Sequence, residues 1–363
     1  MSAQLRDDLT ELMLVPGLAG HEDRVRRAIA ARLPGDPQTD VLGNLWVTFE
    51  GDPALPSVML FTHMDQLGFV VRRIEPSGLI RLERLGGVPE RALAAQAVLL
   101  CVGEGRDVPG LIANKSHHAT KPEEKYRVLP YREVFVDAGF ASATEATAAG
   151  VRIGTPVVYA PRVLPLAGGR IAGTSVDDRA GCAVLLEVAR ALAARDRGPT
   201  VQLCFTVQEE FNLRGAQPLA QRLRPNIALQ IDLMLACDTP DMADVGEMAL
   251  GGGPGLSLYS FHGRGTLNGV IPHPGVVALV EGAAEAAQIP LQRSAQTGVL
   301  TDLSYVQLTG AGVACADLGF PMRYSHSALE VCDLADLAAL SRLLTATLEA
   351  ITPEFTLDRD AHT

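Results

Sequence analysis

Residues 173–181 read Gly-Thr-Ser-Val-Asp-Asp-Arg-Ala-Gly, a loop of mostly small residues that presents two adjacent carboxylates, Asp177 and Asp178. Residues 182–192 follow with apolar side chains at helical spacing, so the two carboxylates are predicted to lie at the start of a helix. An aspartate N-cap followed by an acidic first turn would stabilise such a helix without any catalytic role. Which interpretation holds depends on the polar residues elsewhere in the chain.

Strand-like and helix-like segments alternate around this loop, which indicates an α/β fold. Residues 58–62 and 201–207 are continuous apolar runs of strand length, typical of strands that are buried on both faces of a parallel sheet. Residues 41–47 suggest a hairpin that turns through Gly43-Asn44. Further strands are expected at residues 227–231, 256–261 and 312–317, and a loop at 319–326. Helices are expected at 4–14, 21–33, 215–223, 273–287 and 333–351.

The pattern changes between Gly68 and about Arg162, where short β-like runs alternate with glycine and proline turns. Helical patterns in this part are confined to residues 131–138 and 142–149. We interpret it as a small β-rich domain inserted into the α/β domain. The expected division is therefore residues 1–67 and 165–363 for the catalytic domain and residues 68–164 for the insertion.

Composition restricts the classes of function. Hydrophobic residues make up 47% of the 363 residues, enough for a packed core, and the net charge of −11 argues against nucleic acid as a partner. The first residues are polar and no stretch is apolar for long enough to span a bilayer, so we expect no membrane partner. The six cysteines are scattered without a Cys-x-x-Cys pair, which is typical of buried thiols in a cytoplasmic protein.

Several polar residues fall at the ends of predicted strands or in the loops that follow, where α/β sheets place ligand-binding groups. Two divalent ions about 3.5–4 Å apart can activate a water molecule and polarise a carbonyl for amide hydrolysis. We expect Asp177 to bridge two such ions. His63 and Asp232 would complete the shell of one ion, and Glu210 and His326 that of the other.

Two more residues of this set are assigned catalytic roles. Glu209 lies beside a proposed ligand and is expected to be the general base and acid, with a pKa set by its burial and by the nearby charges. Asp65 lies two residues after His63, where its carboxylate can bind the imidazole and fix the tautomer. The expected activity is removal of N-terminal residues from peptides.

Simpler explanations exist for each residue alone, since a single histidine at a strand end is more often structural than metal-binding. His117 and His118 lie in a predicted loop, where exposure or a subunit contact is favoured over metal binding. A serine hydrolase would need a Gly-x-Ser-x-Gly elbow, which the sequence lacks. A glycosidase needs two facing carboxyl groups, whereas the adjacent Glu209 and Glu210 diverge.

Two other functions stay open at this point. A related two-metal amidase would act on acylated amino acids, and a metal-dependent binding or scaffold protein would have negligible peptidase activity. An endoglucanase is the weakest option on geometry.

Five segments of the chain resemble the TET aminopeptidases, the glutamyl and leucyl aminopeptidases of peptidase family M42, some of which carry the label cellulase M or endoglucanase. They appear in the order of the family, and the likeness runs nearly from end to end. The segments are His63-Met-Asp-Gln-Leu-Gly, Val176-Asp-Asp-Arg-Ala-Gly, Thr206-Val-Gln-Glu-Glu-Phe-Asn-Leu-Arg-Gly-Ala, Ile231-Asp232 with Asp238-Thr-Pro, and Arg323-Tyr-Ser-His-Ser-Ala-Leu-Glu.

This resemblance implies a three-layer α/β catalytic domain of the phosphorylase/hydrolase type with an inserted PDZ-like β-barrel that serves oligomerisation. It implies the ligand set given above, with Asp177 rather than Asp178 as the bridge, and zinc or cobalt as the metal, with manganese as the alternative. It also implies a homo-oligomer, in many members a tetrahedral dodecamer. The chain departs from the family pattern at Gln66, where an acidic residue is usual, and in residues 18–20 and 173–175.

Overall fold

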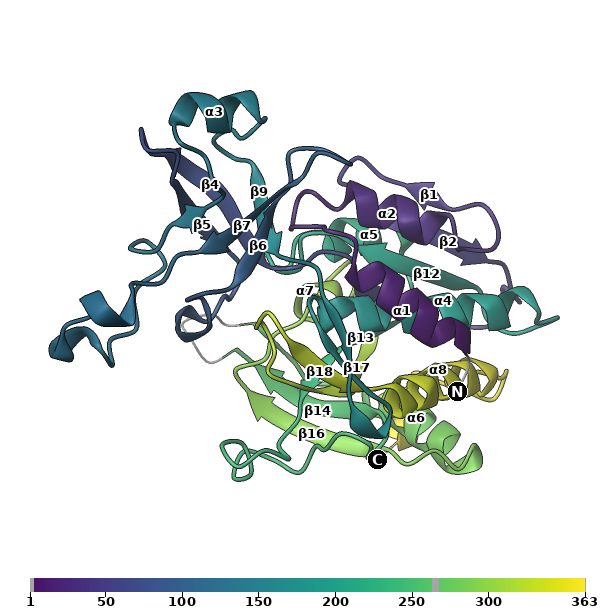
Figure 1. The fold of residues 1–363 in the computed structure, drawn as a ribbon. Helices are drawn as coiled ribbons and strands as arrows, with labels where there is room; N and C mark the ends of the chain where they lie inside the picture. The colour runs from purple at the N-terminus through teal and green to yellow at the C-terminus, as the bar shows by residue number, and fades with distance from the viewer. Residues whose placement is uncertain (1–2, 263–267, 363) are drawn as a thin grey trace.

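The computed structural model describes residues 3–262 and 268–362. The protein consists of a large mixed sheet covered by helices on both faces, with a smaller closed barrel at one side (Figure 1). In the described part of the chain, no helix combines the length and the apolar character needed to cross a membrane.

The large sheet has the strand order β1-β2-β12-β3-β13-β17-β18-β11-β10, and β14 joins it through β17 and also pairs with β15 and β16. Its centre, β12-β3-β13-β17, is parallel throughout. The strand bounds are β1 Gln38–Thr39, β2 Leu45–Phe49, β3 Val58–His63, β10 Val163–Pro165, β11 Arg170–Gly173, β12 Val201–Thr206, β13 Ile227–Leu235, β14 Gly255–Phe261, β15 Gly269–Val270, β16 Gln292–Thr297, β17 Ala314–Arg323 and β18 Glu330–Asp333. All six residues of β3 are buried, as expected for a central strand covered on both faces.

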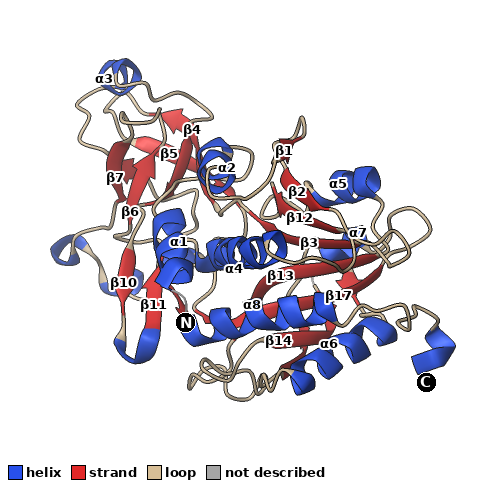
Figure 2. Ribbon diagram, turned by 90° about the vertical axis from the view of Figure 1, so that its right-hand side faces the viewer, coloured by secondary structure: helices blue, strands red, loops and turns tan. Residues whose placement is uncertain are grey.

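Helices cover the two faces of this sheet unequally (Figure 2). One face shares a hydrophobic core with α1 (Ala3–Met13), α2 (Asp23–Ala30), α4 (Val176–Ala193), α6 (Pro274–Ala286) and α8 (Leu334–Glu349). The other face packs against α5 (Ala216–Leu223) and the short α7 (Leu303–Val306). Helix α8 begins after Asp333, whose carboxylate accepts the backbone N–H of Ala335 and so caps the helix as predicted.

The second body is a closed barrel with the strand order β4-β5-β8-β7-β6-β9 and a hydrophobic core of its own. Its strands are β4 Gly68–Ile74, β5 Ile80–Leu85, β6 Ala97–Leu100, β7 Val108–Ile112, β8 Val136–Asp137 and β9 Pro156–Tyr159, and α3 (Ala143–Ala148) lies beside it. The expected α/β fold with an inserted barrel is therefore confirmed. The exact domain limits, residues 68 and 164, stay a prediction.

Three sequence predictions need correction. Residues 131–138 form turns and β8 instead of a helix, because Val136 pairs with Ile80 and Ile112 and completes the barrel. The strand expected to end at 317 continues to Arg323, so the predicted loop begins only after that residue. Strand β13 likewise continues past Asp232, because its ladder with β17 runs on to Leu235 and Met322.

Other predictions are confirmed. The predicted hairpin is present, but its first strand is Gln38–Thr39, so Val41 and Leu42 lie in the turn instead of a strand. The carboxylate of Asp40 accepts the backbone N–H groups of that turn. All six cysteines are free thiols, five of them buried and Cys101 half-buried.

Candidate metal centre

The carboxyl edge of the parallel strands brings imidazole and carboxylate groups together from five different segments. His63 is the last residue of β3, and Asp232 lies within β13. Asp177 belongs to the first turn of α4, Glu210 follows β12, and His326 lies in the loop after β17. These are the five proposed ligands, and the structure places them around one point.

Asp177 lies between the two histidines. Its Oδ1 is 3.0 Å from Nε2 of His63, and its Oδ2 is 3.4 Å from Nε2 of His326. The same Nε2 of His326 lies 3.8 Å from Oε2 of Glu210. One carboxylate thus directs each of its oxygens toward a different imidazole, which is the arrangement a carboxylate needs to bridge two ions.

Two groups of side chains could each hold a metal ion, because their donor atoms lie within 4.8 Å of one another. One group is Asp177, Glu210 and His326, and the other is His63, Asp178 and Asp232. The second group differs from the expectation by including Asp178. The carboxylate of Asp178 already accepts hydrogen bonds on both oxygens, from the Thr62 hydroxyl and from the Gly181 N–H.

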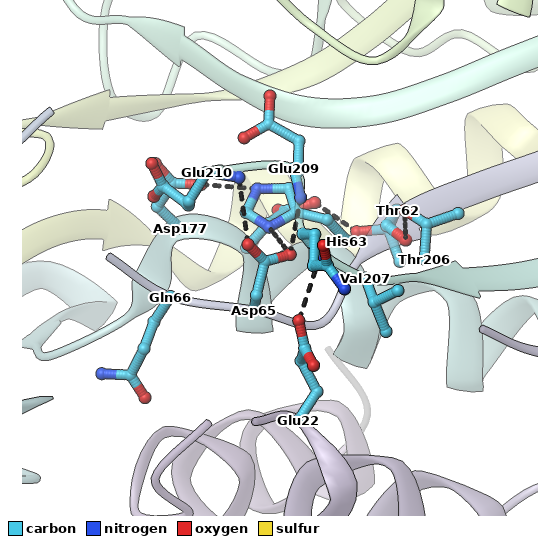
Figure 3. A network of polar contacts seen from close by, with 12 residues as sticks. Glu22, Thr62, His63, Asp65, Gln66, Asp177, Thr206, Val207, Glu209 and Glu210 are labelled. Atoms are coloured by element: carbon cyan, nitrogen blue, oxygen red, sulfur yellow. Dashed lines mark hydrogen bonds and ion pairs between the residues drawn. The ribbon is translucent and has the colours of Figure 1, made fainter. Parts of the chain in front are cut away.

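Asp65 binds the backbone of the loop that carries Glu209. Its Oδ1 accepts the N–H of Glu209 and its Oδ2 the N–H of Glu210, both at 3.0 Å (Figure 3). The distance from Oδ1 of Asp65 to Nδ1 of His63 is 3.5 Å, longer than a good hydrogen bond. Asp65 therefore lies beside His63, as expected, and also positions the loop after β12. The sequence did not reveal this second contact.

Glu330 binds the backbone of two candidate ligands, a contact that sequence reasoning missed. Its side chain is 2% exposed, Oε2 accepts the N–H of Asp177 at 3.0 Å, and Oε1 accepts the N–H of His326 at 2.7 Å. The position was visible as the last residue of the segment 323–330, but nothing in the sequence indicated which groups it would bind. Glu22 plays a comparable part, since it accepts the N–H of Gln208 just before Glu209.

Electrostatics show that the centre concentrates negative charge. Burial, followed by repulsion from neighbouring carboxylates, raises the pKa of Asp232 well above its usual value, and burial also raises that of Glu209 against the pull of His63. Burial raises the pKa of Glu210 to about 7 and that of Asp178 to about 8. Burial would raise the pKa of Asp177 too, but the hydrogen bonds from both histidines lower it. Buried carboxyl groups so arranged fit divalent cations, which would stabilise their ionised forms.

Gln66, which stands where the family usually has an acidic residue, binds groups outside the candidate metal centre. Its Oε1 accepts the N–H of Gly17 at 3.0 Å and lies 3.4 Å from Nη2 of the buried Arg179. Gln66 therefore holds the segment after α1 against the start of α4. His117 and His118 are exposed on the barrel side and belong to neither candidate metal group, which confirms their expected exposure.

Comparison with known proteins decides the family. The family described as M42 glutamyl aminopeptidase matches residues 43–343. The chain belongs to this family. M42 members are metal-dependent aminopeptidases, so the chain is a hydrolase of peptide bonds, and the resemblance predicted from the five segments is confirmed.

Relatives in the M42 family match over nearly the whole chain. The SgcX protein of Escherichia coli K12 is 37% identical over 368 residues, covering 100% of this chain and 98% of its own. The lysyl aminopeptidase of Pyrococcus furiosus is 30% identical over 347 residues, covering 93% of this chain and 95% of its own.

Solved structures show the same fold. Aminopeptidase APDkam598 from Desulfurococcus kamchatkensis superimposes with a TM-score of 0.88 at 33% identity, over 97% of this chain and 96% of that one. The TET1 peptidase of Pyrococcus horikoshii, described as assembling into a tetrahedron or a large octahedral shell, gives 0.85 at 27% identity, over 95% and 99%. The α/β domain with its barrel is therefore the fold of TET aminopeptidases.

Proposed function

We propose that the chain is a two-metal aminopeptidase that removes N-terminal residues from short peptides. The observation that carries the proposal is the Asp177 carboxylate, which directs one oxygen toward His63 and the other toward His326. A carboxylate that bridges two metal ions must present one oxygen to each ion, and each ion here would also bind one of the two imidazoles. The position of Asp177 between His63 and His326 meets this need.

We assign Asp177 as the bridge, His63 and Asp232 to one ion, and Glu210 and His326 to the other. Asp178 and Asp232 both lie beside His63, and each accepts hydrogen bonds on both oxygens, Asp178 from Thr62 and Gly181 and Asp232 from Gln230 and Leu233. We assign Asp232 because the family resemblance implies that residue as the ligand and leaves Asp178 out.

Glu209 is the proposed general base. Two divalent ions bound here would activate a water molecule and polarise the scissile carbonyl. Glu209 would accept the proton of that water and pass it to the leaving amine. Its pKa, raised by burial, favours holding a proton during this transfer, and the hydrogen bond from its N–H to Asp65 fixes its backbone.

Imidazole and carboxylate donors suit zinc or cobalt, with manganese as the alternative. Because the P. horikoshii relative assembles into a tetrahedron, we propose a homo-oligomer of this chain, with a tetrahedral dodecamer as the expected form. The six free thiols suit a reducing compartment, so we place the protein in the cytoplasm.

The test is hydrolysis of a panel of free and N-acetylated aminoacyl anilides by the protein as purified, after chelation, and after zinc or cobalt is restored. Bound metal is counted in the same samples. We expect cleavage of free-amine substrates alone, lost on chelation and regained with about two ions per chain. Cleavage of acetylated substrates would support the deacylase function instead. Two bound metals without any cleavage would support a binding protein.

A further inference from the structure

The turn that follows β5 of the inserted barrel reaches the candidate metal centre. The carbonyl oxygen of Gly87 in this turn lies 3.1 Å from Nδ1 of His326. Its neighbour Gly86 approaches Glu210, since a Cβ atom at Gly86 would lie 3.4 Å from Oε2 of that carboxylate. The barrel therefore approaches two of the proposed ligands, and both are assigned to the same ion.

The Gly87 carbonyl determines which nitrogen of His326 is free to bind a metal. A carbonyl oxygen only accepts hydrogen bonds, so Nδ1 of His326 must donate its hydrogen to Gly87. A neutral imidazole then has its free lone pair on Nε2. Nε2 is the atom that faces the carboxylates, 3.4 Å from Oδ2 of Asp177 and 3.8 Å from Oε2 of Glu210. The contact with the barrel thus selects the tautomer that a metal ion requires at this position.

The two proposed histidine ligands are held in different ways. Nδ1 of His63 has no hydrogen-bond partner among the described residues, and Oδ1 of Asp65 is 3.5 Å away from it. His326 binds instead a main-chain carbonyl that belongs to the barrel. A displacement of the barrel would therefore release His326 and leave the surroundings of His63 in place.

The loop that carries His326 needs support from its neighbours. The φ angle of His326 is 65°, in the left-handed region, which costs about 1–3 kcal/mol for a residue other than glycine and persists only where surrounding groups hold it. Ala328, two residues further on, is buried in the hydrophobic core of the barrel together with Val88, which follows Gly87. One core thus anchors both partners of the hydrogen bond between Gly87 and His326.

The close approach of the turn explains why position 87 is a glycine. A Cβ atom there would lie 2.8 Å from Nδ1 and 3.1 Å from Cε1 of His326, closer than a side-chain carbon normally comes to a non-bonded atom. The imidazole ring or the turn would have to move, and the hydrogen bond would be lost or distorted. Gly87→Ala therefore acts on His326 without changing any charge or any proposed ligand.

We propose that Gly87 is a positioning residue for His326, so that the inserted barrel completes one of the two proposed metal sites. The inference rests on the proposed two-metal function. It adds that the ion assigned to Glu210 and His326 depends on the docked barrel, whereas the ion assigned to His63 and Asp232 does not.

The test is a cobalt titration of the full chain, with affinities measured by competition with a chromogenic chelator and with the visible absorption of bound cobalt recorded. Gly87→Ala should lower the affinity for one ion about 10–100-fold, the usual effect of losing a partner that orients a ligand, and change that for the other ion much less. The absorption of the weakened ion should differ even at saturation, because its imidazole is reoriented. Unchanged affinities and spectra in Gly87→Ala would overturn the proposal.

Gly110→Ala is the matched control, because it adds a methyl group to β7 of the same barrel. A Cβ atom at Gly110 would lie 2.9 Å from Cγ1 of Val136, and its other close neighbours, in Leu100 and Asp137, also belong to the barrel. This variant should lower thermal stability and leave both cobalt affinities unchanged. A loss of affinity equal to that of Gly87→Ala would reflect general damage to the barrel and would overturn the role of Gly87.

Val88→Ala decides the question if Gly87→Ala fails to fold. It removes buried atoms beside the turn without introducing a clash, so the same ion should be weakened, although by less. Unchanged affinity for both ions in Val88→Ala would then overturn the proposal. Failure of the proposed function looks different, since the original protein would bind fewer than two ions or would cleave no free-amine anilide.

Discussion

Glu330→Gln should weaken metal binding without removing any proposed ligand. The two oxygens of Glu330 accept the N–H groups of Asp177 and His326, so one carboxylate fixes the backbone of two ligands from distant segments. Glutamine keeps the shape but offers one oxygen and one NH₂ group, so one of the two N–H donors must face another donor. A buried donor left unsatisfied costs about 1–3 kcal/mol, and the segment that carries it will move to find water.

Two magnitudes follow for this variant. Loss of a residue that orients metal ligands typically lowers metal affinity about 10–100-fold, which we expect for Glu330→Gln in competition with a chromogenic chelator. The metal-free protein should unfold at a lower temperature, by about 2–4 °C for each kcal/mol lost. Turnover at saturating metal should recover to a large fraction of the original value, because the base Glu209 is not touched by the change.

Asp336→Asn is the matched control for this measurement. Asp336 is also a buried carboxylate that accepts two backbone N–H groups, from Gly251 and Gly253 at 2.8 Å, but it binds none of the proposed ligands. It should lower thermal stability to a similar degree and leave metal affinity unchanged. The reasoning is refuted if Glu330→Gln binds metal as tightly as the original protein, or if both variants lose affinity equally.

Further predictions concern the base, the bridge and the contact between the two bodies. Glu209→Gln should bind both metals and lose about 10²–10⁴-fold in kcat, and a loss below tenfold would remove Glu209 as the base. Asp177→Asn should lower the metal content measured by mass spectrometry, and two retained ions would exclude a bridging role. Asp65→Asn should lower both metal affinity and kcat, and excess metal should not restore kcat. Burial would raise the pKa of Asp107, but the contact with Arg24 lowers this pKa overall. The pair therefore stabilises the folded protein at pH values above the ordinary carboxyl pKa, and this stabilisation is lost as the pH falls through the lowered pKa of Asp107. Asp107→Asn should therefore lower the unfolding temperature at pH 7, and its difference from the original protein should vanish in acid.

Much of the fold could be predicted because its central strands must be apolar on both sides. Residues 58–62 and 201–207 are such runs, and they form β3 and β12 at the centre of the sheet. The segment 131–138 was predicted wrongly because its helical spacing is a weak local preference, whereas Val136 gains pairing with two strands distant in sequence. Ladder contacts of this kind also extend β17 beyond the predicted end.

The candidate ligands could be predicted for a different reason. Parallel strands end at the same edge of a sheet, so polar residues that follow several such strands must lie near one another. His63 and Glu210 were found in this manner. Glu330 could not be found, because it begins the antiparallel strand β18 and binds backbone groups whose positions depend on the folded loops. In sequence, a carboxylate that accepts backbone N–H groups has the same appearance as a ligand.

Asp65 and Glu330 differ in what they connect, although each accepts two backbone N–H groups. Glu330 binds the backbones of two proposed ligands, so its loss disturbs the metal positions alone. Asp65 binds the backbones of Glu209 and Glu210, which are the proposed base and a proposed ligand in adjacent residues. Any movement that displaces the ligand therefore displaces the base, and the geometry of proton transfer changes together with the metal position. Excess metal can refill a weakened site, but it cannot return a displaced base to its place, and this is why it should rescue the Glu330 variant and fail to rescue the Asp65 variant.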